Sequence, residues 1–325
     1  MMNISVEKIN KFYRLIQEHD TIIIHRHVRP DPDAVGSQLG LKAWIQNTYP
    51  DKTILAAGTI GESLAWLGKM DEVTRDDYQD ALVIVVDTAD QPRIDGKNYH
   101  YGKSLIKIDH HLLVDSYGDL EIVDEEASST AELLTQMAIC LAEVLPINKE
   151  VADLFYAGIV GDTGRFQFSN TTDQTFLSVG YLMKNGLDNV TINNYFNELE
   201  IEELHFQSLA ISRIRQHEHG VASLIIYQKD LVDYKISEEA TNSITNIPGR
   251  IKGVISWVVF IQQASDSEQF RARIRSKGPN INPVAIAFDG GGHTMASGAN
   301  TTDKQSRDRL IEALIEVNRK YLEEL

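Results

Sequence analysis

The sequence predicts an α/β fold, with a doubly wound, mostly parallel sheet followed by a smaller α+β domain. Over roughly the first 185 residues, short runs rich in Val and Ile alternate with helical patterns. These runs are apolar without regular alternation, which is typical of strands buried on both faces of a parallel sheet. The 325 residues of the chain are enough for two domains of about 100–200 residues each.

The predicted strands of the first domain share this continuous apolar character. They occupy residues 21–26, 53–58, 81–87 and 104–109. Between and after them, apolar residues recur at helical spacing, and cap signals mark several helix ends. One example is Ser129-Thr130-Ala131-Glu132, which has the pattern of a capping box, and another is the stop at Gly186. The predicted helices occupy residues 5–19, 34–46, 130–144, 148–160 and 172–184.

A charged stretch at 190–214 lacks Gly and Pro and predicts a connecting helix or pair of helices. After it, the regular alternation of strand and helix patterns ends. Strand-like runs follow at 220–227, 253–263 and 269–278, and the C-terminal stretch 308–325 is an amphipathic helix pattern. We therefore expect a first domain over 1–188, a helical linker over 189–205 and a second domain over 206–325.

Composition limits the classes of partner. The formal net charge of -16 would repel long nucleic acid on average, although a small anionic substrate is compatible with locally concentrated positive charge. A single cysteine, Cys140, excludes an internal disulfide and suits a reducing compartment. No apolar run approaches the roughly 20 residues of a membrane span, and no secretory signal is visible. We expect a cytoplasmic protein without membrane contact. A homodimer remains one option.

Acidic and imidazole side chains gather where the predicted strands end. In open α/β sheets ligands bind outside the carboxyl ends of the strands. A single such cluster is usually a surface turn, but four clusters at corresponding positions favour a functional site. They are His27 with Asp31 and Asp33, Asp87, Asp109 with His110 and His111, and Asp162 after a helical run.

The chemistry of these residues predicts a pair of divalent metals. Carboxylates with neutral imidazoles suit manganese, iron or zinc, and the lack of thiols argues against structural zinc. Two ions roughly 3.5–4 Å apart activate a water, clamp a phosphoryl oxygen and need no protein nucleophile. Asp31 and Asp33 are separated only by Pro32, and they could serve different ions from one stiff turn.

A second unusual region is basic and rich in glycine. Arg271, Arg273 and Arg275 would share one face of an alternating strand, and guanidinium groups bind phosphate bidentately. The sequence Gly290-Gly291-Gly292-His293 follows, and its backbone could approach an anion closely. A solvated edge strand and a flexible turn are the alternatives, but the two features together favour phosphate recognition.

These motifs resemble the DHH phosphoesterase superfamily. The resemblance rests on the pattern from His27 to Ser37, the motif Asp109-His110-His111, and the acidic residues Asp87 and Asp162. The segments 275–278 and 290–293 resemble the DHHA1 domain of one subfamily, within which the chain looks most like bacterial nano-RNases that also act as 3'-phosphoadenosine-5'-phosphate (pAp) phosphatases. Asp289 stands where many relatives have a further glycine.

The resemblance implies two manganese ions. It assigns His27, Asp31 and Asp87 to one ion, and a second set to the other: Asp33, Asp87, His110 and Asp162. Asp87 would bridge the ions, and His111 would face the scissile phosphate as hydrogen-bond donor or general acid, so we count both as catalytic. Asp109 would orient the imidazoles, and His25 is interpreted as packing or supporting the ligands from behind.

The resemblance also implies where substrate binds. The terminal phosphate would be held by Arg273, Arg275, Ser276, Gly291, Gly292 and His293, together with His111. A cleft between the domains would then admit short oligonucleotides, linear dinucleotides or pAp, and exclude long strands. We expect hydrolysis of these substrates to mononucleotides and AMP. The alternatives are a dedicated enzyme of the cyclic di-AMP pathway that cuts pApA, an inorganic pyrophosphatase, and a non-catalytic nucleotide sensor.

Overall fold

The structure is a computed structural model that describes residues 4–324. The chain divides into two compact units, Met1–Asn197 and Glu198–Leu325. The division falls within the range predicted as a linker, where the structure has two helices, α6 (Asn189–Asn197) and α7 (Ile201–Ser212). Each unit has its own sheet and its own core, so the two are described separately.

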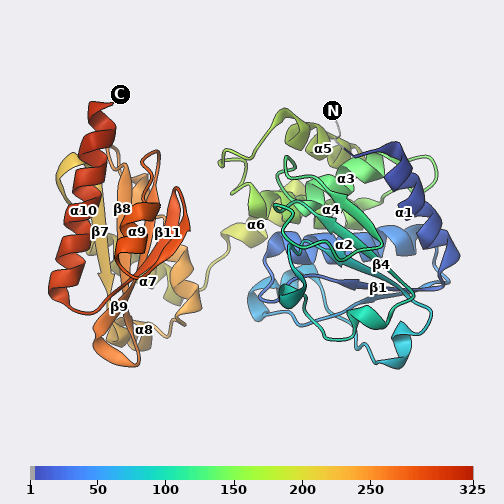
Figure 1. The fold of residues 1–325 in the computed structure, drawn as a ribbon, viewed down its shortest axis with the longest axis horizontal. Helices are drawn as coiled ribbons and strands as arrows, with labels where there is room; N and C mark the ends of the chain where they lie inside the picture. The colour runs from blue at the N-terminus through green and yellow to red at the C-terminus, as the bar shows by residue number, and fades with distance from the viewer. Residues whose placement is uncertain (1–3, 325) are drawn as a thin grey trace. The chain divides into compact units, whose positions relative to one another are not determined.

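The first unit is built on a five-stranded sheet in the order β2-β1-β3-β4-β5, and all of its neighbouring strands are parallel (Figure 1). Four of the strands correspond to predicted ones. The fifth, β5, was not predicted because its four residues alternate between buried and half-buried positions and lack a continuous apolar run. The strands are β1 (Thr21–His25), β2 (Thr53–Ala56), β3 (Leu82–Val86), β4 (Ser104–Asp109) and β5 (Leu120–Val123).

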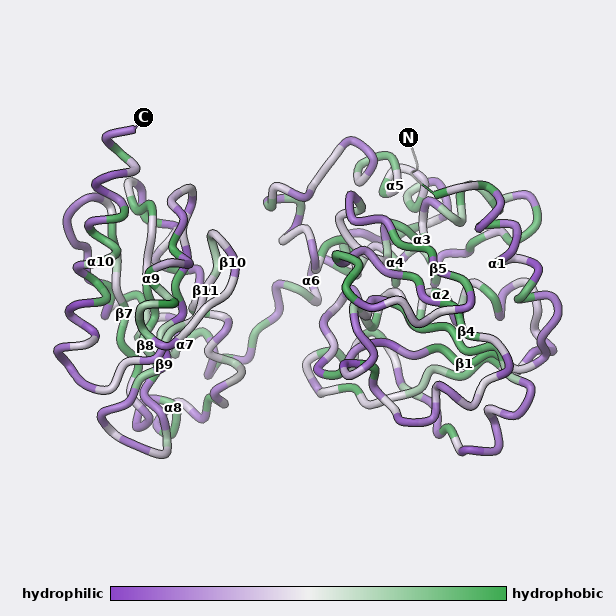
Figure 2. The backbone as a smooth tube through the Cα atoms, viewed as in Figure 1, coloured by the Kyte–Doolittle hydropathy of each residue, from purple (hydrophilic) through white to green (hydrophobic). Residues whose placement is uncertain are grey.

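The helices of this unit pack on one face of the sheet, where Trp44 and Phe155 join the strand residues Ile22 and Ile84 in one core. The opposite face is covered by segments with short 3-10 helices, which supply Tyr78 among others. Both faces are therefore dry, and the strands are hydrophobic along their length (Figure 2). The helices are α1 (Val6–Glu18), α2 (Pro32–Thr48), α3 (Thr130–Cys140), α4 (Lys149–Asp162) and α5 (Asp173–Lys184).

Two glycines allow α2 and α4 to approach closely. A Cβ on Gly36 would lie 2.5 Å from Leu154 O, and a Cβ on Gly158 would lie 2.7 Å from Asp33 Oδ1. Such contacts do not occur in folded proteins, so both positions require glycine. The close approach brings the end of α4, with Asp162, beside the start of α2, with Asp33.

The second unit contains a six-stranded mixed sheet in the order β10-β11-β9-β8-β7-β6. Helices α9 (Asn282–Ala287) and α10 (Lys304–Glu323) pack on one face, and α7 with neighbouring turns covers β7 and β8 on the other. Together the two units confirm the predicted fold class. The strands are β6 (Arg215–Gln216), β7 (Val221–Ile226), β8 (Ser256–Gln263), β9 (Asp266–Ser276), β10 (Gly291–His293) and β11 (Ala296–Thr301).

The remaining helices of this unit are α8 (Gln228–Asp233), α9 (Asn282–Ala287) and the long C-terminal α10 (Lys304–Glu323). Helix α10 is amphipathic, because Leu310 and Leu314 are buried against the sheet while the charged residues of the helix are exposed or half-buried. Within residues 4–324, no helix combines the length and the apolar character that crossing a membrane requires.

Candidate metal centre and arginine face

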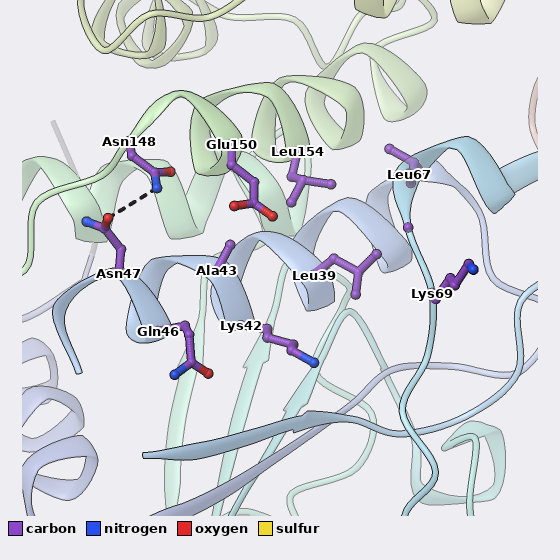
Figure 3. A pocket seen from close by; sticks show the side chains of 11 residues that line it. Leu39, Lys42, Ala43, Gln46, Asn47, Leu67, Lys69, Asn148, Glu150 and Leu154 are labelled. Carbon is purple, nitrogen blue, oxygen red and sulfur yellow. Dashed lines mark hydrogen bonds between the residues drawn. The ribbon is translucent and has the colours of Figure 1, made fainter. Parts of the chain in front are cut away.

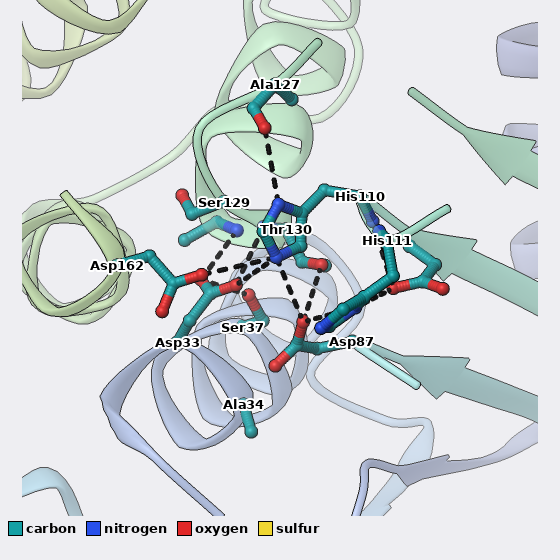
Figure 4. A network of polar contacts seen from close by, with 12 residues as sticks. Asp33, Ala34, Ser37, Asp87, His110, His111, Ala127, Ser129, Thr130 and Asp162 are labelled. Atoms are coloured by element: carbon teal, nitrogen blue, oxygen red, sulfur yellow. Dashed lines mark hydrogen bonds and ion pairs between the residues drawn. The ribbon is translucent and has the colours of Figure 1, made fainter. Parts of the chain in front are cut away.

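The clusters predicted at the strand ends converge at one edge of the first sheet. Figure 4 shows Asp33, Asp87, His110 and Asp162 turned toward one another there. His27 follows β1, Asp87 follows β3, and Asp109 ends β4 with His110 and His111 directly after it. After β1 the chain continues to β2 on one side of the sheet, and from β3 it continues to β4 on the other side. In open α/β sheets such a switch point between neighbouring strands opens a crevice for ligands. Asp162 reaches the same place from the end of α4.

The start of α2 separates the two acidic residues of the first loop. Asp31 is the N-cap, where its Oδ1 accepts a hydrogen bond from Ala34 N at 3.0 Å, and Pro32 occupies the first helical turn. Helix α2 therefore begins two residues earlier than predicted. Asp33 lies inside it and is fully buried, whereas the Asp31 side chain remains about half exposed.

The potential ligands form groups that share members. One group is His27, Asp31 and Asp87, in which His27 Nε2 lies 3.6 Å from Asp31 Oδ2 and 3.4 Å from Asp87 Oδ2. A second is Asp33, His110 and Asp162, in which His110 Nε2 lies 3.2 Å from Asp162 Oδ2. Asp87 Oδ1 lies 3.6 Å from His110 Nε2, so Asp87 faces both groups.

His111 completes a third group with Asp87 and His110. Its Nδ1 lies 3.6 Å from Asp87 Oδ1 but 2.8 Å from Asp109 Oδ1, with which it forms a hydrogen bond. Because Asp109 engages Nδ1, the Nε2 atom of His111 is the nitrogen available to another group, and the ring is about one-third exposed.

Hydrogen bonds to main-chain carbonyls orient both other imidazoles. Nδ1 of His27 lies 2.8 Å from Val28 O, and Nδ1 of His110 lies 3.2 Å from Ala127 O. A carbonyl can only accept, so Nδ1 carries the proton and Nε2 is left toward the carboxylates. This is how metal-binding histidines are usually held. His110 Nε2 is buried and has no hydrogen-bond partner among the described residues.

The electrostatics of the cluster fit divalent cations. Asp31, Asp33, Asp87 and Asp162 bring four carboxylates together, and two divalent cations would balance their charge if the imidazoles bind as neutral ligands. Without cations, burial and then the nearby Asp87 and Asp162 carboxylates raise the pKa of Asp33. Burial likewise raises the pKa of Asp162. This donor set therefore suits a pair of metal ions.

The two imidazoles respond to the same charges. Burial lowers the pKa of His27, but Asp31 and Asp87 outweigh it and raise the pKa to about 10. Burial also lowers the pKa of His110, and Asp162 with Asp33 raises it to about 10. In the metal-free protein both rings thus hold a proton where a ligand needs a lone pair, and metal binding must displace these protons.

Backbone strain marks the ligand loops. Asp87 has a φ of 50°, and Arg29, Arg165 and Phe166 beside the other ligands also have positive φ values. Such conformations cost of order 1 kcal/mol or more in non-glycine residues and persist where the surroundings fix them. For Asp87 these surroundings include Ile108 O, which accepts a hydrogen bond from its amide at 2.9 Å, and Thr130 Oγ1, which donates to its carboxylate at 3.1 Å.

In the second unit, the arginines lie on one face of a strand in the interior of the sheet. Arg271, Arg273 and Arg275 alternate along β9 with the buried residues Ala272 and Ile274, which face α9 and α10. Because β9 pairs with β8 on one side and β11 on the other, the solvated edge strand considered from the sequence is excluded. The arginine face is defined here as these three side chains and their neighbours across the sheet.

The glycine segment contributes to the same face. Gly291 pairs with Gly298, which pairs with Arg273, and His293 pairs with Ala296, which pairs with Arg275. A Cβ on Gly291 would meet nothing within 4 Å, so this part of the surface is open. Two predicted residues lie differently: Gly292 alternates to the opposite face, and Ser276 ends β9, where its hydroxyl donates to Pro279 O at 2.6 Å.

Comparisons with known proteins agree with this architecture. Residues 21–159 match the model of the DHH family, N-terminal domain, and residues 210–320 match the DHHA1 domain. A Streptococcus mutans protein named "Probable bifunctional oligoribonuclease and PAP phosphatase NrnA" is 42% identical over 92% of this chain and 95% of its own length. The chain belongs to the DHH family.

A second relative and one solved structure are also similar to this DHH protein. A Bacillus subtilis protein named "Bifunctional oligoribonuclease and PAP phosphatase NrnA" is also 42% identical, over 92% of this chain and 95% of its own. The crystal structure of an exopolyphosphatase-related protein from Bacteroides fragilis has a TM-score of 0.84 and covers 98% of this chain and 99% of that chain. At 23% identity, this likeness concerns the fold. The predicted resemblance to the DHH and DHHA1 families is confirmed.

The DHH unit contains a buried lysine that the sequence reasoning missed. Lys107 lies on β4 with no exposed surface, and its Nζ donates to Ala89 O at 2.8 Å and Asp115 O at 2.9 Å. These carbonyls belong to the segments that follow Asp87 and His111. Nζ also lies 3.6 Å from Asp109 Oδ2, an oxygen without a hydrogen-bond partner among the described residues. The only signal in the sequence is a charged residue inside an apolar strand.

A second buried cation supports the His27 loop. Arg26 has no exposed surface, donates to His27 O at 2.9 Å and to Asp95 Oδ2 at 2.5 Å, and also donates to Thr59 O. His25 lies beside it, with Nδ1 2.7 Å from Asp95 O and Nε2 2.9 Å from the Tyr78 hydroxyl. Both nitrogens of His25 are therefore engaged away from the carboxylates, which fits its predicted supporting place.

The DHH unit has another hollow, which lies between α2 and α4 (Figure 3). It measures about 360 Å³, and its lining includes Lys42, Lys69, Asn148 and Glu150. Because Glu150 is its only acidic lining residue and no histidine lines it, this hollow lacks the ligand set of the strand-end cluster. Among the described residues, the groups of three or more potential metal ligands all lie at the strand ends.

Proposed function

We propose that this protein is a manganese-dependent phosphoesterase that hydrolyses very short oligoribonucleotides and linear dinucleotides to mononucleotides, and pAp to AMP. The proposal rests mainly on two groups of potential metal ligands at the switch point of a parallel sheet. Asp87 lies beside His27 of one group and His110 of the other. The names of the Streptococcus mutans and Bacillus subtilis relatives support the choice of substrates.

In this proposal, His27 and Asp31 hold one divalent ion, Asp33, His110 and Asp162 hold the other, and Asp87 serves both. When bound, the ions would lower the pKa of a water and neutralise charge on the phosphoryl oxygens. The chain itself prepares these residues. Val28 O and Ala127 O fix the imidazoles, and the amides of Thr130 and Ala131 donate to Asp33 at 2.7 and 2.9 Å. Preorganised ligands need not rearrange when the substrate arrives.

His111 serves the leaving group. Asp109 accepts from His111 Nδ1 at 2.8 Å and from the amides of His110 and His111 at 3.0 and 3.3 Å, which fixes the ring. When Nε2 carries a proton, it can donate to a phosphate oxygen or to the departing ribose oxygen. His111 is the main partner that keeps Asp109 charged, and Lys107 adds a smaller contribution. Burial opposes that charge, but His111 and Lys107 outweigh it, and the pKa of Asp109 is lowered.

The DHHA1 unit supplies the grip on the substrate. Arg273 and Arg275 are half-buried, and no carboxylate of the described residues lies within ion-pair distance of either guanidinium. Unpaired, partly buried cations in a chain of net charge -16 favour an anionic ligand. Gly291 and His293 share this face and would complete the contacts with a terminal phosphate, while Ser276 and Gly292 would contribute from the neighbouring backbone.

Hydrolysis of four substrates by the purified protein with Mn²⁺ tests the proposal: pAp, pApA, a 5-mer RNA and cyclic di-AMP. We expect release of AMP from pAp and of mononucleotides from pApA and the 5-mer. Turnover of pApA alone would instead favour the dedicated enzyme of the cyclic di-AMP pathway. Pyrophosphate is included as a further substrate, and its preferential hydrolysis would favour a pyrophosphatase. If none is hydrolysed, the proposed function is wrong.

A further inference from the structure

The proposed contacts with a terminal phosphate use Arg273 and Arg275 but not Arg271, which is the third arginine of the arginine face. It lies two residues before Arg273 on β9, is exposed, and pairs across the sheet with Ile261 of β8 and Asn300 of β11. Among the side chains that the structure describes, no carboxylate lies within ion-pair distance of the Arg271 guanidinium, and the guanidinium forms no hydrogen bond. Three cations in a row are thus held side by side without anionic neighbours in contact.

Like charges on alternate residues of one strand face repel each other. Nearby Arg271 and Arg275 lower the pKa of Arg273, after the larger contribution of burial. Among the described side chains, Glu238 acts in the opposite direction on the pKa of Arg273. The repulsion between the three arginines destabilises the free protein. Their arrangement therefore suits a ligand that carries several negative charges along a line.

The geometry of the strand sets the spacing of such a ligand. Alternate residues of a β-strand are about 7 Å apart, at roughly 3.4 Å per residue. This is close to the separation of consecutive phosphates in an extended single-stranded nucleic acid. The step from Arg273, which holds the terminal phosphate together with Arg275, to Arg271 therefore matches about one nucleotide.

The surface beside the row is open on the side of β11. On the β11 side the residues that share the arginine face are Ala296, Gly298 and Asn300. A Cβ added to Gly298 would meet only Ala272 O, at 3.8 Å. The Asn300 side chain is held aside, because its amide donates to Asp289 O at 2.9 Å. Small or tethered neighbours leave room for a ligand backbone to run along β9.

We propose that Arg271 forms an additional phosphate subsite, so that the arginine face binds consecutive phosphates of an oligonucleotide longer than a dinucleotide. The proposal rests on the proposed function, and it names three- to five-residue oligonucleotides as the substrates that use the whole row. Mononucleotides such as pAp and dinucleotides would be held by Arg273 and Arg275 and would not reach Arg271.

The test compares the full-length Arg271→Ala protein with Arg309→Ala, which removes the same charge from an exposed position of α10 on the opposite face of the sheet. We expect Arg271→Ala to raise the KM for a 5-mer RNA up to about fivefold, as for one exposed ion pair. The KM for pAp and pApA should stay within about twofold of the wild type, and kcat should not change. Arg309→Ala should leave all these values unchanged.

Salt dependence gives a second, independent measurement. One lost phosphate contact should reduce the slope of log KM against log salt for the 5-mer by about 0.7, and should not change the slope for pAp. Equal effects of Arg271→Ala on the 5-mer and pAp, or no effect on either, would overturn the subsite.

A binding assay separates this proposal from the proposed function. Fluorescence anisotropy of a labelled 5-mer in EDTA reports binding without hydrolysis. Weaker binding by Arg271→Ala but not by Arg309→Ala supports the subsite even if the wild type hydrolyses nothing, in which case only the proposed function fails. Equal 5-mer binding by both variants and the wild type would contradict the subsite.

Discussion

Replacing Lys107 with methionine tests the polar support beneath the metal ligands. The change keeps the long apolar stem and removes only the charged amine. In the wild type that amine donates to Ala89 O and Asp115 O, lies 3.6 Å from Asp109 Oδ2 and lies 4.8 Å from the centre of the Tyr117 ring. The variant leaves two carbonyls without their donor and one carboxylate without its cation.

The expected cost follows from these contacts. Each lost hydrogen bond contributes about 1 kcal/mol, and breaking a buried ion pair by removing one partner costs about 3–5 kcal/mol in all. Asp109 keeps its hydrogen bonds from His110 and His111, so we expect the lower end, about 3 kcal/mol. For a unit of this size that loss lowers the melting temperature by roughly 6–12 °C.

Urea denaturation in EDTA measures the free energy of unfolding without the contribution of bound metal. Lys149→Met is the matched control, since Lys149 pairs with Asp153 on the surface of the same unit with 58% of its side chain exposed. The control should lose less than about 0.5 kcal/mol. A Lys107→Met protein whose unfolding free energy lies within about 1 kcal/mol of the wild type would refute the reasoning. Removal of one partner from a buried ion pair should lower the unfolding free energy by more than this.

The other predictions concern metal binding. His27→Asn should retain about one Mn²⁺ per chain after dialysis, whereas His25→Phe should retain two, because His25 points to Tyr78 and Asp95 rather than to the carboxylates; equal metal content in the two variants would contradict this assignment. The raised pKa values of His27 and His110, both about 10, stabilise the metal-free fold below about pH 6.5 and lose this effect as the pH rises toward 10. Mn²⁺ should therefore raise the melting temperature more at pH 9 than at pH 6, and calorimetry at pH 7.5 in buffers of different ionisation enthalpy should show proton release on binding.

Much of the architecture could be predicted because local signals and global fold agree. The strands of the parallel sheet are continuous apolar runs, and the residues that follow them must meet at one edge, so Asp87 and His110 could be placed together before any coordinates. Strand β5 was not predicted because it is short and only partly buried. The start of α2 was missed by two residues because the acidic turn is also its cap, with Asp31 as N-cap and Pro32 in the first turn.

The supporting residues could not be predicted, because long-range contacts define them. Nothing in the local sequence of Lys107 indicates that carbonyls 18 and 8 residues away will receive its amine. Arg26 likewise depends on Asp95, which is 69 residues away. The arginine row was predicted as one face, but only the pairing of β9 with both β8 and β11 shows that it lies inside the sheet and not at its edge.

The central claim is that Asp87 joins two metal ions, and the Mn²⁺ content of the wild type and of Asp87→Asn tests it most directly. Asparagine tolerates the positive φ of this position, so the variant should fold. After dialysis against Mn²⁺ we predict two ions per wild-type chain and at most one in Asp87→Asn, measured by mass spectrometry of the metal. One ion in the wild type, or two in the variant, would contradict the account.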